Sequence, residues 1–131
     1  MMGPLILTAG LALALQGSAA APYYEGVARD SLGAWSFTSG EVRTQGTVKT
    51  TSVGTLYDTP TPFNGLPTPV AWSTHQVAFD CQARTATFLS GANYALGGGL
   101  INAAQPSPAA PWTDYTSGFQ QLAAQVCAMK P

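Results

Sequence analysis

The stretch QVAFDC at residues 76–81 places Val77, Phe79 and Cys81 at every second position, with Gln76 and Asp80 between and before them. Successive side chains of a strand point to opposite faces of a sheet. Val77, Phe79 and Cys81 therefore share one face, and the polar Gln76 and Asp80 lie on the other. This alternation predicts a half-buried strand whose apolar face covers a core.

A helix is predicted near the C-terminus. Ser117 followed by Gln120 fits a capping box, in which a hydroxyl and an amide each satisfy a free backbone N–H group. Four apolar residues then recur at helical spacing and form one stripe. They are Phe119, Leu122, Ala123 and Val126. Cys127 lies beside that stripe.

An apolar leader precedes the domain. Residues 5–15 are almost entirely apolar, and Ser18 and Ala20 have the small side chains and the separation that favour cleavage after Ala20. As a helix this run spans about 16 Å, too short for the roughly 30 Å hydrocarbon core of a bilayer. We therefore expect residues 1–20 to be a signal peptide and residues 21–131 to form a single exported domain.

Cys81 and Cys127 are the two cysteines of the chain. An even number of cysteines in an exported chain favours a disulfide. Such a bridge would pin the C-terminal helix onto the strand face that carries Val77 and Phe79. Two buried thiols or half of a metal site are the alternatives. A metal site needs further ligands, and His75 is the only histidine, so no metal is expected.

Length, composition and charge favour one β-rich domain. A chain of 131 residues has room for a single domain. Apolar residues make up 46% of it and supply a core, while 14 Gly and 10 Pro favour turns over long helices. The net charge is −1 and the five Lys and Arg are widely spaced, which argues against nucleic-acid binding. The expected fold class is α+β and β-rich.

Other strands are indicated by runs of Thr, Val and aromatic residues. These runs span residues 34–38, 41–44, 47–57, 84–90 and 94–101, and the last is broken by Gly97-Gly98-Gly99. Turns are predicted at Gly46, at residues 82–83 and at residues 91–93. The Pro-rich segments 58–69 and 102–111 are predicted to be loops, because Pro has no N–H to donate to a sheet. The first of these loops is either a connector or a binding loop.

No arrangement of reactive side chains indicates catalysis. His75 has no Ser or Asp at a spacing typical of a nucleophile and its base. The six carboxylates are scattered along the chain. The run Gly97-Gly98-Gly99 lacks the Lys and the Ser or Thr of a phosphate-binding loop. The chain is therefore expected not to be an enzyme and to use no cofactor.

Residues between Val70 and Cys127 follow the pattern of a known family in order and spacing. They are Phe79-Asp80-Cys81, Arg84, Tyr94, Gly98, Pro111-Trp112, Ser117, Leu122 and Val126-Cys127. On this pattern the chain resembles the surface-adhesin protein E family of small exported Gram-negative proteins. Trp35 and Val42-Arg43 extend the resemblance into the first half. The chain departs from the family in a shorter interval between Trp35 and Val42 and in the Pro-rich insertion after Asp58.

The resemblance implies a compact antiparallel sheet with one C-terminal helix, tied to it by a Cys81–Cys127 disulfide. It carries over structural positions only, namely Cys81, Cys127 and Trp112, and no ligand-binding residue. The best-known members bind host proteins such as laminin, vitronectin and plasminogen at the outer membrane. It therefore implies a non-enzymatic domain that binds a protein partner, in the periplasm or at the cell surface.

Two alternative functions stay open. The segment Ser90-Gly91-Ala92-Asn93-Tyr94 looks like the Ser-Gly-x-x-Tyr segment of periplasmic lysozyme inhibitors. Asn93 stands where those proteins usually have a basic residue. The other alternative is an accessory or structural protein of the cell envelope that binds no small ligand.

Overall fold

Six strands form one antiparallel meander, and two short strands extend it. The computed structural model describes residues 25–130, and the leader expected at residues 1–20 lies outside them. The strand order is β1-β2-β4-β5-β6-β7, with β3 paired to β4 and β8 paired to β6. The strands are β1 (Glu25–Arg29), β2 (Gly33–Phe37), β3 (Arg43–Gln45), β4 (Val48–Thr61), β5 (Val70–Asp80), β6 (Thr85–Tyr94), β7 (Leu100–Ala104) and β8 (Ala110–Pro111).

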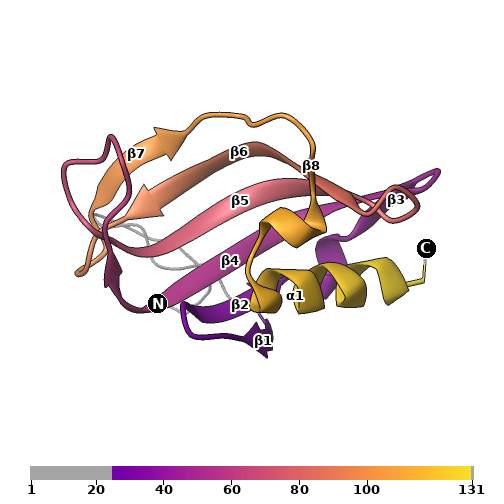
Figure 1. The fold of residues 1–131 in the computed structure, drawn as a ribbon, viewed down its shortest axis with the longest axis horizontal. Helices are drawn as coiled ribbons and strands as arrows, with labels where there is room; N and C mark the ends of the chain where they lie inside the picture. The colour runs from indigo at the N-terminus through magenta and orange to yellow at the C-terminus, as the bar shows by residue number, and fades with distance from the viewer. Residues whose placement is uncertain (1–24, 131) are drawn as a thin grey trace, which may run out of the picture.

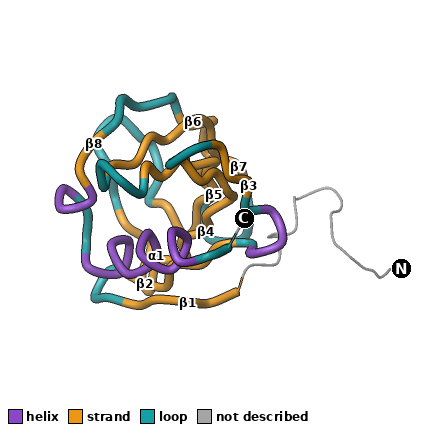
Figure 2. The backbone as a smooth tube through the Cα atoms, turned by 90° about the vertical axis from the view of Figure 1, so that its right-hand side faces the viewer, coloured by secondary structure: helices purple, strands orange, loops and turns teal. Residues whose placement is uncertain are grey.

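The sheet curls around one α-helix. Helix α1 (Ser117–Ala128) follows the last strand, and the short 3-10 helices η1 (Ser39–Glu41) and η2 (Trp112–Asp114) connect strands and helix. Figure 1 shows α1 lying against the sheet near β1 and β2, and Figure 2 shows the strands bending around it. We call the sheet face toward α1 the inner face and the opposite one the outer face. The predicted β-rich α+β fold, with an antiparallel sheet and a C-terminal helix, is confirmed.

The long strands β4 and β5 determine which side chains meet α1. Their register pairs Val53 with His75 and Thr55 with Ser73. Directly paired residues of an antiparallel sheet share a face, and side chains alternate along each strand. These four side chains therefore point to the inner face together with Val77, as the alternation of residues 76–81 predicts.

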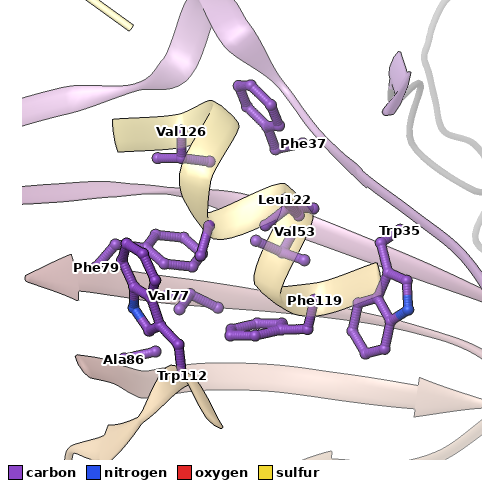
Figure 3. Packing of buried hydrophobic residues seen from close by; sticks show 11 residues of the cluster. Trp35, Phe37, Val53, Val77, Phe79, Ala86, Trp112, Phe119, Leu122 and Val126 are labelled. Carbon is purple, nitrogen blue, oxygen red and sulfur yellow. The ribbon is translucent and has the colours of Figure 1, made fainter. Parts of the chain in front are cut away.

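Phe119 of α1 lies at the centre of the core (Figure 3). Its ring centroid is 5.6 Å from that of Trp35 and 5.7 Å from those of Phe79 and Phe88. The predicted apolar stripe is confirmed, because all four of its residues are completely buried. Burial of this stripe against the inner face is the main favourable term that holds a short helix in place.

The start of α1 is capped by a residue that is distant in sequence. The capping box predicted from Ser117 and Gln120 is wrong. Thr116 occupies the N-cap position without a side-chain cap bond, and the Gln120 amide donates to a carbonyl of the preceding loop at 3.0 Å. The backbone N–H of Gly118 instead donates to the carboxylate of Asp30 at 2.8 Å. A tertiary contact thus replaces the local cap.

The Asp30 carboxylate joins α1 to the turn between β1 and β2. One oxygen accepts hydrogen bonds from the backbone N–H groups of Leu32 at 2.9 Å and Gly33 at 3.3 Å. The other oxygen accepts from the Trp35 indole at 3.2 Å as well as from Gly118. A Cβ at position 118 would lie 2.4 Å from the Trp35 ring and 2.6 Å from the carboxylate, which explains the glycine in the first helical turn.

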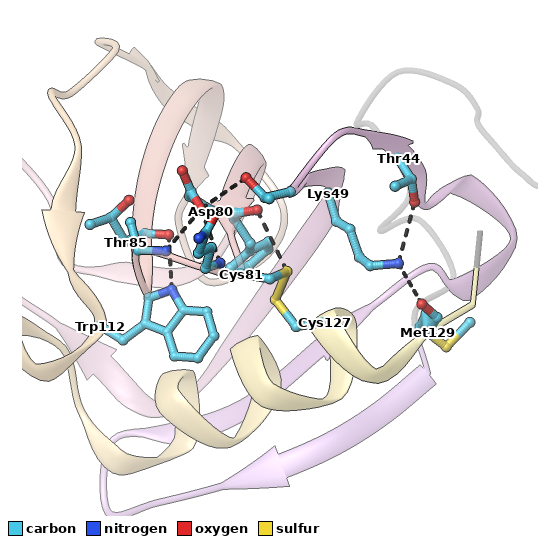
Figure 4. The surroundings of a disulfide bond; sticks show 12 residues. Thr44, Lys49, Asp80, Cys81, Thr85, Trp112, Cys127 and Met129 are labelled. Carbon is cyan, nitrogen blue, oxygen red and sulfur yellow. Dashed lines mark hydrogen bonds between the residues drawn. A yellow bond between two sulfur atoms is a disulfide. The ribbon is translucent and has the colours of Figure 1, made fainter.

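The end of α1 is held by a cation from the sheet. Lys49 of β4 is buried, and its ammonium donates to the carbonyl of Met129, at the C-cap, and to the Thr44 hydroxyl (Figure 4). An anion at the N-terminus and a cation at the C-terminus both complement the helix dipole. The Gln125 side chain adds a bond to the Val27 carbonyl of β1 at 2.8 Å. The β1–β2 turn therefore fixes the start of α1, and strand residues fix its end.

Two predicted loops contain strand residues. The prediction of a loop at residues 58–69 is wrong for its first part, since β4 continues through Thr61. The pairing with β5 is irregular between Leu56 and Thr61, and such a bulge tolerates Pro60, which has no N–H to donate. The loop predicted at residues 102–111 likewise holds the end of β7 and all of β8.

The turn predicted at residues 91–93 is wrong, because these residues lie inside β6. Gly91 pairs with His75 of β5 on one side and with Ala104 of β7 on the other. The turn comes later, where Gly97 and Gly98 adopt φ values of +96° and +95°. The break predicted at Gly97-Gly98-Gly99 is therefore the chain reversal, and pairing on both sides keeps residues 91–93 extended.

The hydrogen bonds to Asp30 change the pKa of its carboxyl group. Burial is the largest single effect and by itself raises the pKa of the carboxyl. The Thr116 side chain and the backbone N–H groups of Gly118, Leu32 and Gly33 favour the ionised form, and together they bring the pKa below its ordinary value of 3.8. Ionised Asp30 therefore stabilises the fold above that value, and its contribution is lost as the pH falls through the lowered pKa.

Replacing Asp30 tests this cap. Asp30→Ala should lower the free energy of unfolding at pH 7 by about 2 kcal/mol, because it leaves the Trp35 indole and the Gly118 N–H without an acceptor. Asp30→Asn keeps a neutral acceptor and should cost roughly half as much. Urea unfolding at pH 7 and at pH 3 measures both effects. An alanine variant as stable as the wild type at pH 7 would show that the cap contributes nothing.

Candidate functional site

The two cysteines form the disulfide that the sequence predicts. Cys81 directly follows β5, Cys127 lies in the last turn of α1, and their Cα atoms are 5.7 Å apart (Figure 4). The bridge links the strand that carries Val77 and Phe79 to the helix that packs on it. Disulfides persist in oxidising compartments, so the bridge is consistent with an exported protein.

Trp112 has a structural position. It is buried, and its indole N–H donates to the Thr85 carbonyl at 2.9 Å. The guanidinium carbon of Arg84 lies 4.6 Å from its ring centroid, in the geometry of a cation–π contact. Trp112 thereby anchors the segment between β8 and α1 to the start of β6.

The carboxylates serve separate local contacts. Asp58 pairs with Arg29, Asp30 caps α1, Glu41 accepts from a serine of β4, and Asp80 accepts from backbone N–H groups of the turn that follows it. Across residues 25–130, no three His, Cys, Asp or Glu side chains gather as metal ligands. The expectation that the chain is not an enzyme stays a prediction.

His75 lies within β5, with its side chain on the inner face. Its ring packs edge-on against Phe88, with centroids 5.0 Å apart. Burial lowers the pKa of the imidazole below its ordinary 6.5, so His75 is neutral at pH 7. Gly91 makes room for the ring, because a Cβ there would lie 2.3 Å from it. The glycine that looks like a turn signal in the sequence therefore serves a close side-chain contact.

A cavity of about 300 Å³ opens on the inner face beside the start of α1. We call it the inner cavity. Its lining is mostly apolar and comes from the turn between β1 and β2, from β2, β4, β5 and β6, from the loop after β4 and from the segment before α1. The aromatic side chains of the lining are Trp35, Tyr57, Phe63, Phe88 and Tyr115. The Pro-rich loop thus contributes Phe63, which packs edge-on against Tyr57 with centroids 5.7 Å apart.

Ser73 is the unusual polar group of the inner cavity. The residue is 1% exposed, and within the described part of the chain its Oγ is the buried side-chain atom without a hydrogen-bond partner. Burial raises the pKa of Tyr57, and the nearby Ser73 hydroxyl opposes that rise without reaching the geometry of a hydrogen bond. An unpartnered buried hydroxyl costs about 1–3 kcal/mol, so it calls for an explanation.

A second surface lies at paired positions across four adjacent strands. Leu56 of β4 pairs with Trp72 of β5, Trp72 with Tyr94 of β6, and Tyr94 with Leu100 of β7. We call these four residues the outer row, since Trp72 has the opposite parity to Val77 along β5 and so faces away from α1. Trp72 and Tyr94 stack with centroids 3.9 Å apart, and Leu56 and Leu100 are 60% and 64% exposed.

Neither the inner cavity nor the outer row was predicted from the sequence. Strand β5 was predicted only from residue 76 onward, whereas it begins at Val70 and holds both Ser73 and Trp72. The available signal was the alternation along residues 72–75. It is weak, because neither face of this segment is more apolar than the other. The segment Ser90–Tyr94, likened above to lysozyme inhibitors, lies within β6 and pairs with β5 and β7.

Comparisons of the chain with family models, curated proteins and solved structures found no match. The resemblance to the surface-adhesin protein E family therefore stays a prediction. Between residues 25 and 130, no helix is both long and apolar enough to cross a membrane.

Removing the disulfide tests its role. Cys127→Ser should lower the free energy of unfolding under oxidising conditions by about 4 kcal/mol, because the bridge closes a loop of 46 residues in the unfolded chain. With dithiothreitol present, wild type and variant should unfold at nearly the same urea concentration. Equal stability of the two proteins without reductant would contradict a stabilising bridge.

Adding a methyl group at Gly91 tests the placement of His75. Gly91→Ala should destabilise the fold by about 1–3 kcal/mol, because the methyl group overlaps the His75 ring and the Thr74 carbonyl. Displacement of the ring toward solvent should also raise the pKa of His75 toward 6.5, measured by NMR titration. Gly99→Ala is the control, since a Cβ there meets nothing within 4 Å. An unchanged His75 titration in Gly91→Ala would mean that the ring lies elsewhere.

Proposed function

We propose that the chain is an exported, non-enzymatic domain that binds another protein, with the outer row as its contact surface. The observation that carries the proposal is the pairing of four large apolar residues across four adjacent strands of one sheet. Exposed apolar groups of this kind mark interaction surfaces more often than scattered single residues do.

The centre of the outer row has the composition of an interface hot spot. Trp and Tyr are enriched among residues that dominate binding energies, and a stacked pair loses little side-chain entropy on binding. Trp72 and Tyr94 form such a pair, and flanking leucines extend the apolar surface by one strand on each side. Leu56 and Leu100 still have most of their side-chain surface available to a partner.

The partner fitted to this surface is a protein that presents a neutral, apolar patch. The outer row carries no charged side chain, and the whole chain has a net charge of −1, so charge attraction contributes little to recognition. Cell-surface or periplasmic location fits the disulfide and the family that the sequence resembles. Because of the resemblance to that family, the first partners to test are laminin, vitronectin and plasminogen.

Surface variants test the proposal with the fold intact. The double variant Leu56→Ser, Leu100→Ser should weaken binding to a partner at least tenfold in biolayer interferometry, about 1.4 kcal/mol or more, because it removes exposed apolar area. Its thermal unfolding should match that of the wild type. Leu89→Ser, at a leucine 42% exposed elsewhere on β6, should bind like the wild type.

Two results would contradict the proposal. Full binding by the double variant would exclude the outer row as the contact surface. Inhibition of lysozyme by the wild type, measured in the same preparations, would instead favour the periplasmic-inhibitor alternative, because an adhesin-like domain leaves that enzyme untouched.

A further inference from the structure

The inner cavity has the size and lining of a small-molecule site. Ligand sites are concave, mostly apolar and supplied with a few polar groups that orient the ligand. In another protein, a cavity of about 150 Å³ lined by aliphatic and aromatic side chains holds benzene. The inner cavity, at about 300 Å³, has room for one substituted aromatic ring.

Aromatic side chains form the walls on several sides. Trp35 and Tyr57 come from β2 and β4, Phe88 from β6, and Tyr115 from the segment before α1. The Trp35 indole N–H donates a hydrogen bond to Asp30, which fixes the orientation of the ring. Rings of this kind, fixed by the fold, favour a planar apolar ligand through offset and edge-to-face contacts.

Apart from the Asp114 carboxylate, the polar groups of the cavity are neutral, and they select the polar part of the ligand. The Ser73 hydroxyl is buried and has no partner among residues 25–130, so it is free both to donate and to accept a hydrogen bond. His75 is neutral because burial lowers its pKa. The lining contains no Lys or Arg, and Asp114 is its one carboxylate, so an anionic ligand finds no counter-charge. A hydroxyl group matches these partners without burying a charge.

We propose that the inner cavity binds a small neutral aromatic molecule carrying one hydroxyl group, which takes Ser73 as its hydrogen-bond partner. The site lies on the face of β5 opposite to the outer row. A small molecule in the inner cavity and a protein on the outer row therefore bind at separate places. Experiments can disprove either proposal without affecting the other.

Titration with p-cresol and with toluene tests this proposal directly. The two probes share a ring and a methyl group, and p-cresol adds the hydroxyl. In ¹H–¹⁵N NMR spectra of the exported protein, both should shift the Trp35 indole signal saturably. The indole signals of Trp72 and Trp112, which do not line the cavity, should stay in place. The p-cresol complex should be about two- to tenfold tighter, the range expected for one hydrogen bond.

Ser73→Ala separates the hydrogen bond from the shape of the cavity. The variant should bind both probes equally well and should be at least as stable as the wild type, because it removes a hydroxyl that has no partner. Thr74→Ala, one residue along on the opposite face of β5, should keep the preference for p-cresol.

Several outcomes would overturn the proposal. They are the absence of a saturable Trp35 shift with either probe, a preference for p-cresol that survives in Ser73→Ala, and a shift at Trp72 instead of Trp35. Tighter binding of benzyltrimethylammonium or benzoate than of p-cresol would overturn the assignment to a neutral ligand.

Discussion

The hydrogen bonds of one carboxylate determine how the helix meets the sheet. Asp30 accepts from the turn between β1 and β2, from the indole of Trp35 and from Gly118 in the first turn of α1. Lys49 holds the other end of the helix, and the disulfide fixes its last turn. The apolar stripe drives the helix onto the sheet, but it is these polar contacts that set where along the sheet the helix begins.

Both candidate surfaces follow from that placement. Because α1 starts beside Trp35, it covers only part of the inner face and leaves the part around Ser73 and His75 as a cavity. The same strand presents Trp72 to the opposite face, where no helix packs within the described chain. Because side chains alternate along β5, Ser73 and His75 line the inner cavity and Trp72 lies at the centre of the outer row. The segment that leads into α1 completes the cavity with Tyr115.

Local patterns account for the features that the sequence predicts correctly. The alternation of Val77 and Phe79 and the helical spacing around Phe119 are properties of neighbouring residues, so strand, helix and their disulfide could be inferred. Asp30 and Gly118 lie far apart in sequence, and no local pattern links them. Gly91 and Pro60 have turn-forming character, but pairing with neighbouring strands overrides it. The cavity depends on side chains from seven segments that are separate in the sequence, so it appears only in three dimensions.

The most direct measurement of the central contact is an NMR titration of the Asp30 carboxyl carbon, followed together with the Gly118 amide proton and the Trp35 indole proton. We predict one shared midpoint below 3.8 for all three signals, because a single carboxylate accepts both hydrogen bonds while the fold is intact. A midpoint at or above 3.8, or a Gly118 amide that does not follow Asp30, would contradict the claim that this carboxylate holds the helix to the sheet.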